Sequence, residues 1–186
     1  DIVYIATINT LHYDNTMMML KAGKNVLLEK PMAMDYQEAQ AMAKAAKDAN
    51  RLLLTNFWTR FFPVTKYVRT AIASQRLGNI VAMRGDFGFP APPNPQDRLL
   101  NRTQGGGAML DLGCYLINLA VMANPTKELP SEVQASTQTT YWGAEYGIDT
   151  ETSFILKWNN SRVANVDESS AASRRAPKIM SNSTMI

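Results

Sequence analysis

The sequence predicts an α/β fold in which a domain with a parallel sheet is followed by an α+β domain with a mostly antiparallel, open sheet. Two observations lead to this prediction. Short apolar strands alternate with helical stretches up to about residue 58, and longer strands with alternating apolar and polar residues follow in the second half. Alternating strands and helices form parallel sheets with right-handed crossovers, whereas long alternating strands are typical of antiparallel sheets with one face wet or covered by a partner.

Three strands separated by two helices are expected in the first half. They fall at residues 1–7, 9–22, 25–28, 35–49 and 52–57. Gly23 is placed to end the first helix as a C′ glycine, and Asp35 with Glu38 has the spacing of a capping box at the start of the second. The strands are apolar enough to be buried on both faces of the sheet.

The second half predicts two more helices and three longer strands. They fall at residues 64–73, 80–87, 108–122, 132–141 and 152–158, and the tail from Ala171 onward gives no clear prediction. Apolar and polar residues alternate from Glu132 to Tyr141, which predicts a half-exposed strand. The run Gly105–Gly107 is not followed by the Lys-Ser/Thr of a phosphate-binding loop, so we interpret it as a flexible hinge before the next helix.

Composition describes an ordinary globular protein, with 46% hydrophobic and 19% charged residues and a net charge of +3. No Lys or Arg run carries interleaved aromatic residues, so no nucleic-acid partner is expected. No apolar run approaches the roughly 18 residues of a membrane span and no signal peptide is evident, which predicts a cytoplasmic protein without a membrane partner. Cys114 and His12 are the single cysteine and histidine, so neither an internal disulfide nor a multi-His metal site is expected.

Residues that could bind a ligand follow each strand of the predicted parallel sheet. They are Asn9 and His12 after the first strand, Glu29, Lys30 and Pro31 after the second, and Trp58 and Arg60 after the third. Ligands of open parallel sheets bind outside the carboxyl ends of the strands, so these side chains are expected to share one site. The alternative is that Glu29 and Lys30 are solvated turn residues.

Asp111 and Tyr115 are four residues apart on a predicted helix and therefore share one face. An alcohol that loses hydride must also lose a proton, and a phenol with a pKa near 10 is a poor base at neutral pH unless a cation favours the phenolate. Lys30 is the candidate for that cation. The alternative is a helix with one exposed acid and one tyrosine at the edge of the core.

An ordered set of segments resembles the oxidoreductase family of glucose-fructose oxidoreductase and inositol dehydrogenase. The segments are "IATINTLH", "AGKNVLLEKPMAM", "NFWTRFFP", "LGNIVAMRGDFG" and "GGGAMLDLGCYLINLA", and the resemblance covers Asp1 to about Trp158. It implies that residues 1–58 are the carboxyl-terminal part of a Rossmann domain. It also implies that residues 59–186 are a truncated α+β substrate and oligomerisation domain, whose open sheet forms a homodimer.

The resemblance also implies the activity and the site residues. The activity is hydride transfer between NADP or NAD and a CH–OH group of a small molecule, a cyclic trans-dihydrodiol or a sugar such as D-xylose. Lys30, Tyr115 and Asp111 match catalytic positions. The residues that match the cofactor side are Thr7, Asn9, His12, Glu29, Lys30, Pro31, Trp58 and Arg60.

One departure from the family concerns the glycine-rich turn G-x-G-x-x-G, which holds the cofactor pyrophosphate and does not occur in this sequence. We therefore expect the chain to be a fragment of a longer dehydrogenase. The alternative is a truncated, catalytically inactive protein derived from the family, with a binding or oligomerising role.

Overall fold

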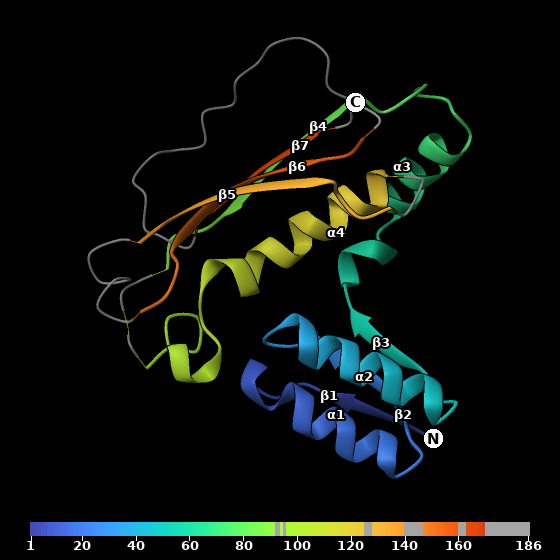
Figure 1. Ribbon diagram of the computed structural model, residues 1–186, viewed down its shortest axis with the longest axis vertical. Helices are drawn as coiled ribbons and strands as arrows, with labels where there is room; N and C mark the ends of the chain where they lie inside the picture. Colours follow the sequence, from blue (N-terminus) through green and yellow to red (C-terminus); the bar gives the residue numbers. More distant parts are fainter. Residues whose placement is uncertain (92–93, 95, 125–127, 140–146, 160–162, 170–186) are drawn as a thin grey trace.

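The computed structural model describes residues 1–91, 94, 96–124, 128–139, 147–159 and 163–169 and contains two sheets with helices against them (Figure 1). The first sheet has the order β1 (Ile2–Ile5), β2 (Asn25–Glu29), β3 (Leu53–Asn56), and both pairings are parallel. Helices α1 (His12–Lys21) and α2 (Tyr36–Asp48) make the two crossovers. The parallel half of the predicted fold class is confirmed.

Local sequence signals set the ends of these helices. Gly23 ends α1 with a φ of +71°, a left-handed conformation that favours glycine. The Asp35 carboxylate accepts a hydrogen bond from Glu38 N–H at 2.9 Å, which caps α2 as predicted. The Glu38 carboxylate returns to the N–H of Met34 at 3.1 Å, one residue before the cap.

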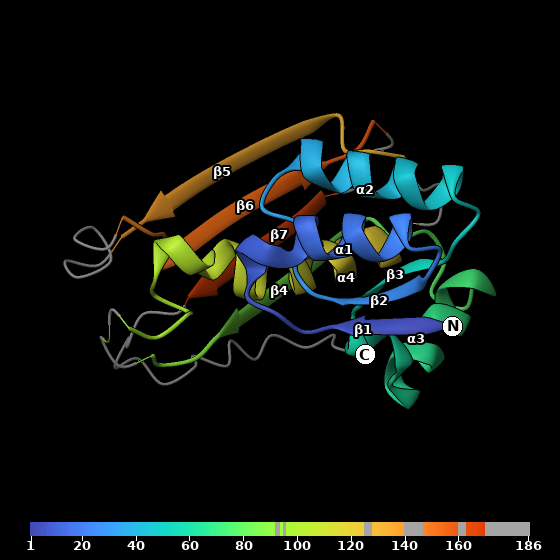
Figure 2. The same ribbon diagram turned by 90° about the horizontal axis from the view of Figure 1, so that it is seen from below.

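The first sheet is buried on one face, and the prediction of burial on both faces is wrong for the described residues. Val26 and Leu28 of β2 pack in one core with Met42 of α2, and α1 and α2 run side by side on that face (Figure 2). On the opposite face Ile2 and Tyr4 are 66% and 56% exposed. Both crossovers follow the same face, because strands added in one direction with right-handed connections keep their helices on one side.

The second sheet has the order β4 (Ala82–Gly88), β7 (Val163–Ser169), β6 (Glu151–Lys157), β5 (Glu132–Gln138). β4 pairs with β7 in parallel, and the two other pairings are antiparallel. This mixed sheet agrees with the predicted, mostly antiparallel one. Strand β7 was not predicted from the sequence, and the predicted extension of β5 to Tyr141 reaches residues outside those described.

Strand β5 is exposed on both faces rather than half-exposed as predicted. It lies at the edge of the sheet, whereas the helix beneath the sheet packs on the two central strands through Phe154 of β6 and Val166 of β7. Alternating apolar residues such as Val133, which is 60% exposed, therefore stay accessible.

That helix is α4 (Cys114–Ala123), and it lies between the two sheets (Figure 1). A π-helical turn at Met109–Gly113 precedes it, and α3 (Pro63–Ala73) lies near its far end. By length and composition alone, Arg102–Ala123 is apolar enough to cross a membrane. Leu116 and Ala120 pack instead into the core beneath the second sheet, which accounts for the apolar composition.

Candidate functional site

An ion pair joins the first sheet to the turn before α4. Lys30 Nζ donates to Asp111 Oδ1 at 2.6 Å and to the Asp111 carbonyl oxygen at 2.7 Å. The two side chains are only 14% and 13% exposed, whereas Arg98, 3.8 Å from the same carboxylate, is 57% exposed. Asp111 is thus the counter-ion of Lys30. Because the pair is largely buried, dissolved salt weakens its attraction less than that of a surface pair.

The position of Lys30 follows from the end of β2. The strand ends at Glu29, directly before Lys30, and the Lys30–Pro31 peptide bond is cis. The carboxyl end of a parallel strand is the edge where ligands of such sheets bind. Asp111 comes from the π-helical turn, so the two partners are 81 positions apart in sequence.

Tyr115 lies within reach of the same ammonium group. Lys30 Nζ is 5.2 Å from the centre of its ring, and Trp58 Nε1 donates to its hydroxyl at 2.7 Å. Phe57 and Phe87 each meet the ring edge-on with centroids 5.9 Å away. Because the hydroxyl oxygen accepts from Trp58, its own proton remains to be donated to another group.

The pKa of Tyr115 is raised, mainly because the hydroxyl is partly buried. The hydrogen bond from Trp58 acts in the opposite direction, while the negative charges of Asp111 and Glu29 add to the increase. The expectation that Lys30 would hold Tyr115 toward phenolate is therefore corrected. The Lys30 ammonium is paired with Asp111. The Asp111 carboxylate largely compensates the positive charge that would otherwise favour the phenolate of Tyr115.

Glu29 ties the ends of the three strands of the first sheet together. Its carboxylate accepts hydrogen bonds from the Tyr4 hydroxyl on β1 and from Asn56 Nδ2 on β3, the latter at 2.7 Å. Burial acts to raise the pKa of Glu29, but the bonds from Tyr4, Asn56 and Lys30 N–H, together with the Lys30 charge, hold it below its usual value. Glu29 is therefore ionised next to Lys30 at neutral pH.

A second group of predicted residues surrounds the loop after β1. His12 is fully buried, with Nδ1 2.7 Å from the carbonyl oxygen of Pro31 and Nε2 3.1 Å from that of Thr7. Asn9 Nδ2 donates to the Gly105 carbonyl at 2.8 Å. These contacts connect the loops after β1 and β2 and the glycine run, so His12 shapes the edge of the site from within the protein.

The glycine run is closely packed. A Cβ on Gly106 would lie 2.7 Å from the carbonyl oxygen of Leu99, and one on Gly107 would lie 2.3 Å from Asp149 Oδ1. Gly105 has a φ of +79°. Close approach of the backbone accounts for these glycines without the hinge that the sequence suggested.

Arg60 belongs to the 3₁₀ turn after β3 and contacts α4 beyond Tyr115. Its Nε donates to Asn118 Oδ1 at 2.6 Å, and its guanidinium is 5.6 Å from the centre of the Phe57 ring. Asn118 is one turn beyond Tyr115 and 9% exposed. Lys30, Asp111, Tyr115 and Trp58 thus form one cluster, while Arg60 contacts the helix that carries Tyr115.

A hollow of about 190 Å³ adjoins Tyr115 on the side of Trp58. Its lining is mainly apolar, with Phe87, Leu119 and Met122 among the wall residues. Among the described residues, no three His, Cys, Asp or Glu side chains come together as candidate metal ligands. The cluster and this wall offer a proton donor beside an apolar surface.

Sequence reasoning missed several residues of this region, namely Tyr4, Asn56, Phe57, Phe87 and Asn118. Asn56 had a usable signal, because it ends the third strand just as Glu29 ends the second. Asn118 had one too, as an amide within the otherwise apolar run "LINLAVMA". Nothing local marks Phe87, which meets Tyr115 only through the tertiary fold.

Two family descriptions match the chain. "Oxidoreductase family, NAD-binding Rossmann fold" matches residues 1–57, and "GFO/IDH/MocA C-terminal domain" matches residues 65–183.

Individual proteins are similar as well. Trans-1,2-dihydrobenzene-1,2-diol dehydrogenase of Xenopus laevis is 36% identical over 164 residues, which cover 88% of this chain and 48% of that protein. D-xylose 1-dehydrogenase (NADP(+)) 2 of Haloferax volcanii is 32% identical over 169 residues, covering 91% and 50%. The chain therefore spans about half the length of these relatives.

Among solved structures, the aldose-aldose oxidoreductase of Caulobacter crescentus complexed with glycerol superposes with a TM-score of 0.83. The identity is 32%, and the match covers 92% of this chain and 51% of that one.

Proposed function

Because the chain belongs to the GFO/IDH/MocA oxidoreductase family, we propose that it carries the catalytic cluster of an NAD(P)-dependent dehydrogenase that acts on a CH–OH group. The substrate class is a cyclic trans-dihydrodiol or a sugar such as D-xylose. The relatives named for these substrates support this choice. The observation that carries the proposal is the meeting of Lys30, Asp111 and Tyr115 at the carboxyl end of β2.

The proton chemistry belongs to Tyr115. With a raised pKa, its hydroxyl is neutral at pH 7 and suited to donate a proton to the carbonyl oxygen of a substrate being reduced. In the reverse direction the phenolate takes the proton of the alcohol, so oxidation is favoured at alkaline pH. Lys30 donates hydrogen bonds and is placed to hold the reacting oxygen, while Asp111 fixes the ammonium group in place.

The residues at the edge of the parallel sheet fit the nicotinamide end of the cofactor. His12 holds the loops after β1 and β2 together, and these loops place Thr7, Glu29 and Lys30 along one edge. When bound, the nicotinamide accepts or supplies the hydride. We propose NADP, or alternatively NAD, because the D-xylose relative is named for NADP. Since G-x-G-x-x-G does not occur among these residues, they are assigned to the nicotinamide end and not to the pyrophosphate.

The aromatic wall near Tyr115 supports a ring-shaped substrate. Trp58 and Phe87 present apolar surface to the hollow beside the Tyr115 hydroxyl. An apolar wall favours the unsubstituted face of a cyclic diol, whereas a sugar needs more hydrogen-bonding groups. A dihydrodiol should therefore be turned over with a lower KM than D-xylose.

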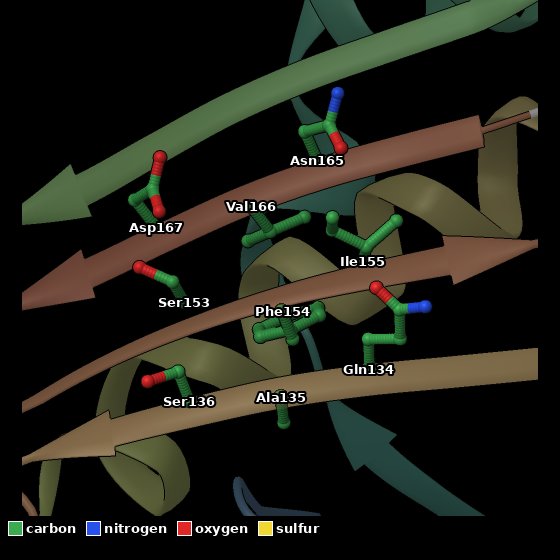
Figure 3. A pocket seen from close by; sticks show the side chains of 9 residues that line it. All are labelled: Gln134, Ala135, Ser136, Ser153, Phe154, Ile155, Asn165, Val166 and Asp167. Carbon is green, nitrogen blue, oxygen red and sulfur yellow. The ribbon is translucent and has the colours of Figure 1, made fainter.

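The outer face of the second sheet is the proposed dimer surface. It carries a hollow of about 450 Å³ on the side opposite α4, with Ile155 surrounded by Gln134, Ser153 and Asn165 (Figure 3). Charges of both signs occur on neighbouring strands, such as Lys157 paired with Glu132 at 3.0 Å. A mixed, partly apolar face suits a second copy of the same surface related by a two-fold axis.

Division at residue 58 into a cofactor domain and a substrate and oligomerisation domain is part of the same proposal, as is a cytoplasmic location. Steady-state assays of the complete protein with NADP or NAD test the function. Turnover of trans-1,2-dihydrobenzene-1,2-diol or D-xylose is the expected result. Absence of turnover with both substrates and both cofactors would favour the binding or oligomerising alternative.

A further inference from the structure

We infer that Arg60 and Asn118 form a positioning pair that sets the orientation of α4 and of Tyr115, so that Arg60 acts through this helix and not on the cofactor. This inference rests on the proposed function, because the reaction gives the placement of Tyr115 its consequence. The resemblance had placed Arg60 among residues bordering the cofactor. Its side chain instead contacts Asn118 of α4 and the ring of Phe57.

The first step is the burial of Asn118. The residue is 9% exposed and comes from a helix whose other residues include no amide. A buried amide oxygen without a donor is costly, so such groups are nearly always hydrogen-bonded. Arg60 Nε meets this need at 2.6 Å, and a hydrogen bond from a charged donor is stronger than one between neutral groups.

The second step is the place of this bond along the helix. Lys30–Asp111, Trp58–Tyr115 and Arg60–Asn118 are three contacts made at successive turns. In each contact, one residue follows the carboxyl end of β2 or β3. Its partner belongs to α4 or to the π-helical turn before α4. Tyr115 lies between the outer two contacts, so loss of the Arg60 bond removes the polar restraint on the turn that follows Tyr115.

The third step is a contact of Arg60 with the wall behind Tyr115. Its guanidinium stacks near Phe57 at 5.6 Å, and the Phe57 ring meets Tyr115 at 5.9 Å with an interplanar angle of 83°. Arg60 thus restrains Tyr115 through the helix backbone and through the ring beside it. A planar guanidinium serves both contacts, whereas an ammonium group does not.

The fourth step is the direction in which Arg60 faces. It lines a hollow of about 520 Å³ with Arg69, Ile72 and Val121, between α3 and the end of α4. Among the described residues, the lining of this hollow includes neither Lys30 nor any residue of the loops after β1 and β2. The hollow that Arg60 lines is therefore separate from the proposed nicotinamide edge.

A double-mutant cycle in the complete protein tests this inference. The variants are Arg60→Met, Asn118→Leu and the two combined, with Arg69→Met as the matched control in the same hollow. We expect each single change to lower kcat by roughly 10-fold, since small misplacements of a reacting group are costly. The KM for NADP should stay within about twofold of the wild-type value. The kcat of the double variant should be no lower than that of the slower single variant.

A raised KM for NADP in Arg60→Met but not in Asn118→Leu would overturn the inference in favour of direct cofactor contact. Multiplicative losses, or a kcat unchanged in both variants, would also overturn it. Asn118→Asp keeps the acceptor and should retain at least half of the kcat, which provides a folded comparison if Asn118→Leu is unstable. A loss of more than about 10-fold in the folded Asn118→Asp protein would count against the pair.

A second readout separates this inference from the proposed function. Thermal unfolding midpoints of the same four proteins should show non-additive losses if the residues are coupled. If the wild-type protein has no dehydrogenase activity, the proposed function fails while the midpoints still report on the pair. Additive midpoints in an active wild-type protein would contradict the pair and leave the function standing.

Discussion

Trp58 donates its indole N–H to the hydroxyl of Tyr115 at 2.7 Å, and this bond joins the 3₁₀ turn after β3 to the helix beneath the second sheet. It fixes the direction of the phenol and occupies one lone pair of its oxygen. It also acts against the burial that raises the pKa of Tyr115. Trp58 is thus expected to influence both the position and the acidity of the proposed proton donor.

Trp58→Phe should move the alkaline rise of substrate oxidation to higher pH. An aromatic ring is kept, although a smaller one, but the donor that lowers the pKa of Tyr115 is lost, so the phenolate forms at higher pH. The pH profile of kcat for diol or sugar oxidation measures this change. Trp158→Phe is the control, because its N–H donates to the Glu128 carbonyl elsewhere in the fold; an equal shift in both variants would contradict the prediction.

Asp111→Asn should move the same limb in the opposite direction. The Asp111 carboxylate raises the pKa of Tyr115, and its removal also leaves the Lys30 charge uncompensated. Both effects stabilise the phenolate, so the activity should rise at lower pH than in the wild type. Asp86→Asn, at an exposed position on β4, is the comparison. If the alkaline limb of Asp111→Asn coincides with that of the wild type, the Asp111 carboxylate does not influence the pKa of Tyr115.

Lys30→Met should lower kcat by roughly 10²-fold, the usual scale for loss of acid–base assistance. The ammonium that holds the reacting oxygen is lost, and Asp111 keeps its charge without its main partner. Steady-state kinetics at saturating NADP provide the test. Lys44→Met, which removes an exposed pair with Asp48, should leave kcat unchanged; normal turnover of Lys30→Met would exclude Lys30 from the mechanism.

Gly106→Ala should destabilise the protein by about 1–3 kcal/mol, the usual cost of forcing extra atoms into packed structure. The added Cβ would lie 2.7–2.8 Å from three backbone atoms of the segment Arg98–Asn101. Gly78→Ala is the comparison, because nothing lies within 4 Å of its Cβ and the cost there is only the strain of a φ of +66°. Urea unfolding of both variants should rank Gly106→Ala as the less stable one.

The parallel half of the fold was predictable because its signals are local. Gly23 and Asp35 mark helix ends, and apolar strands alternate with helices at short spacing. The exposure of Ile2 and Tyr4 was not predictable in this way, because it depends on which face the crossovers follow. Strand β7 was missed because "VANVDES" has no long run of alternating apolar residues. Its pairing with β4 joins segments that are far apart in the sequence, so no local signal marks it.

The structure brings the predicted residues Lys30, Asp111 and Tyr115 together, but their pairing was not predicted. The resemblance to the family led to these three residues, and the strand ends and the i, i+4 spacing agreed with it. The sequence alone did not indicate that the Asp111 carboxylate would take up the Lys30 charge, since the two lie 81 positions apart. That pairing changes the expected acidity of Tyr115, from favoured phenolate to a phenol that stays protonated at neutral pH.

The most direct measurement is the pH profile of kcat for Tyr115→Phe in the complete protein, compared with the wild type. Phenylalanine keeps the ring among Phe57, Trp58 and Phe87 and removes only the hydroxyl. We predict a loss of roughly 10²-fold or more in kcat together with the disappearance of the alkaline limb, while the protein stays folded. A near-normal kcat with an unchanged pH profile would contradict the proposed role of Tyr115 and leave its ring as a packing residue.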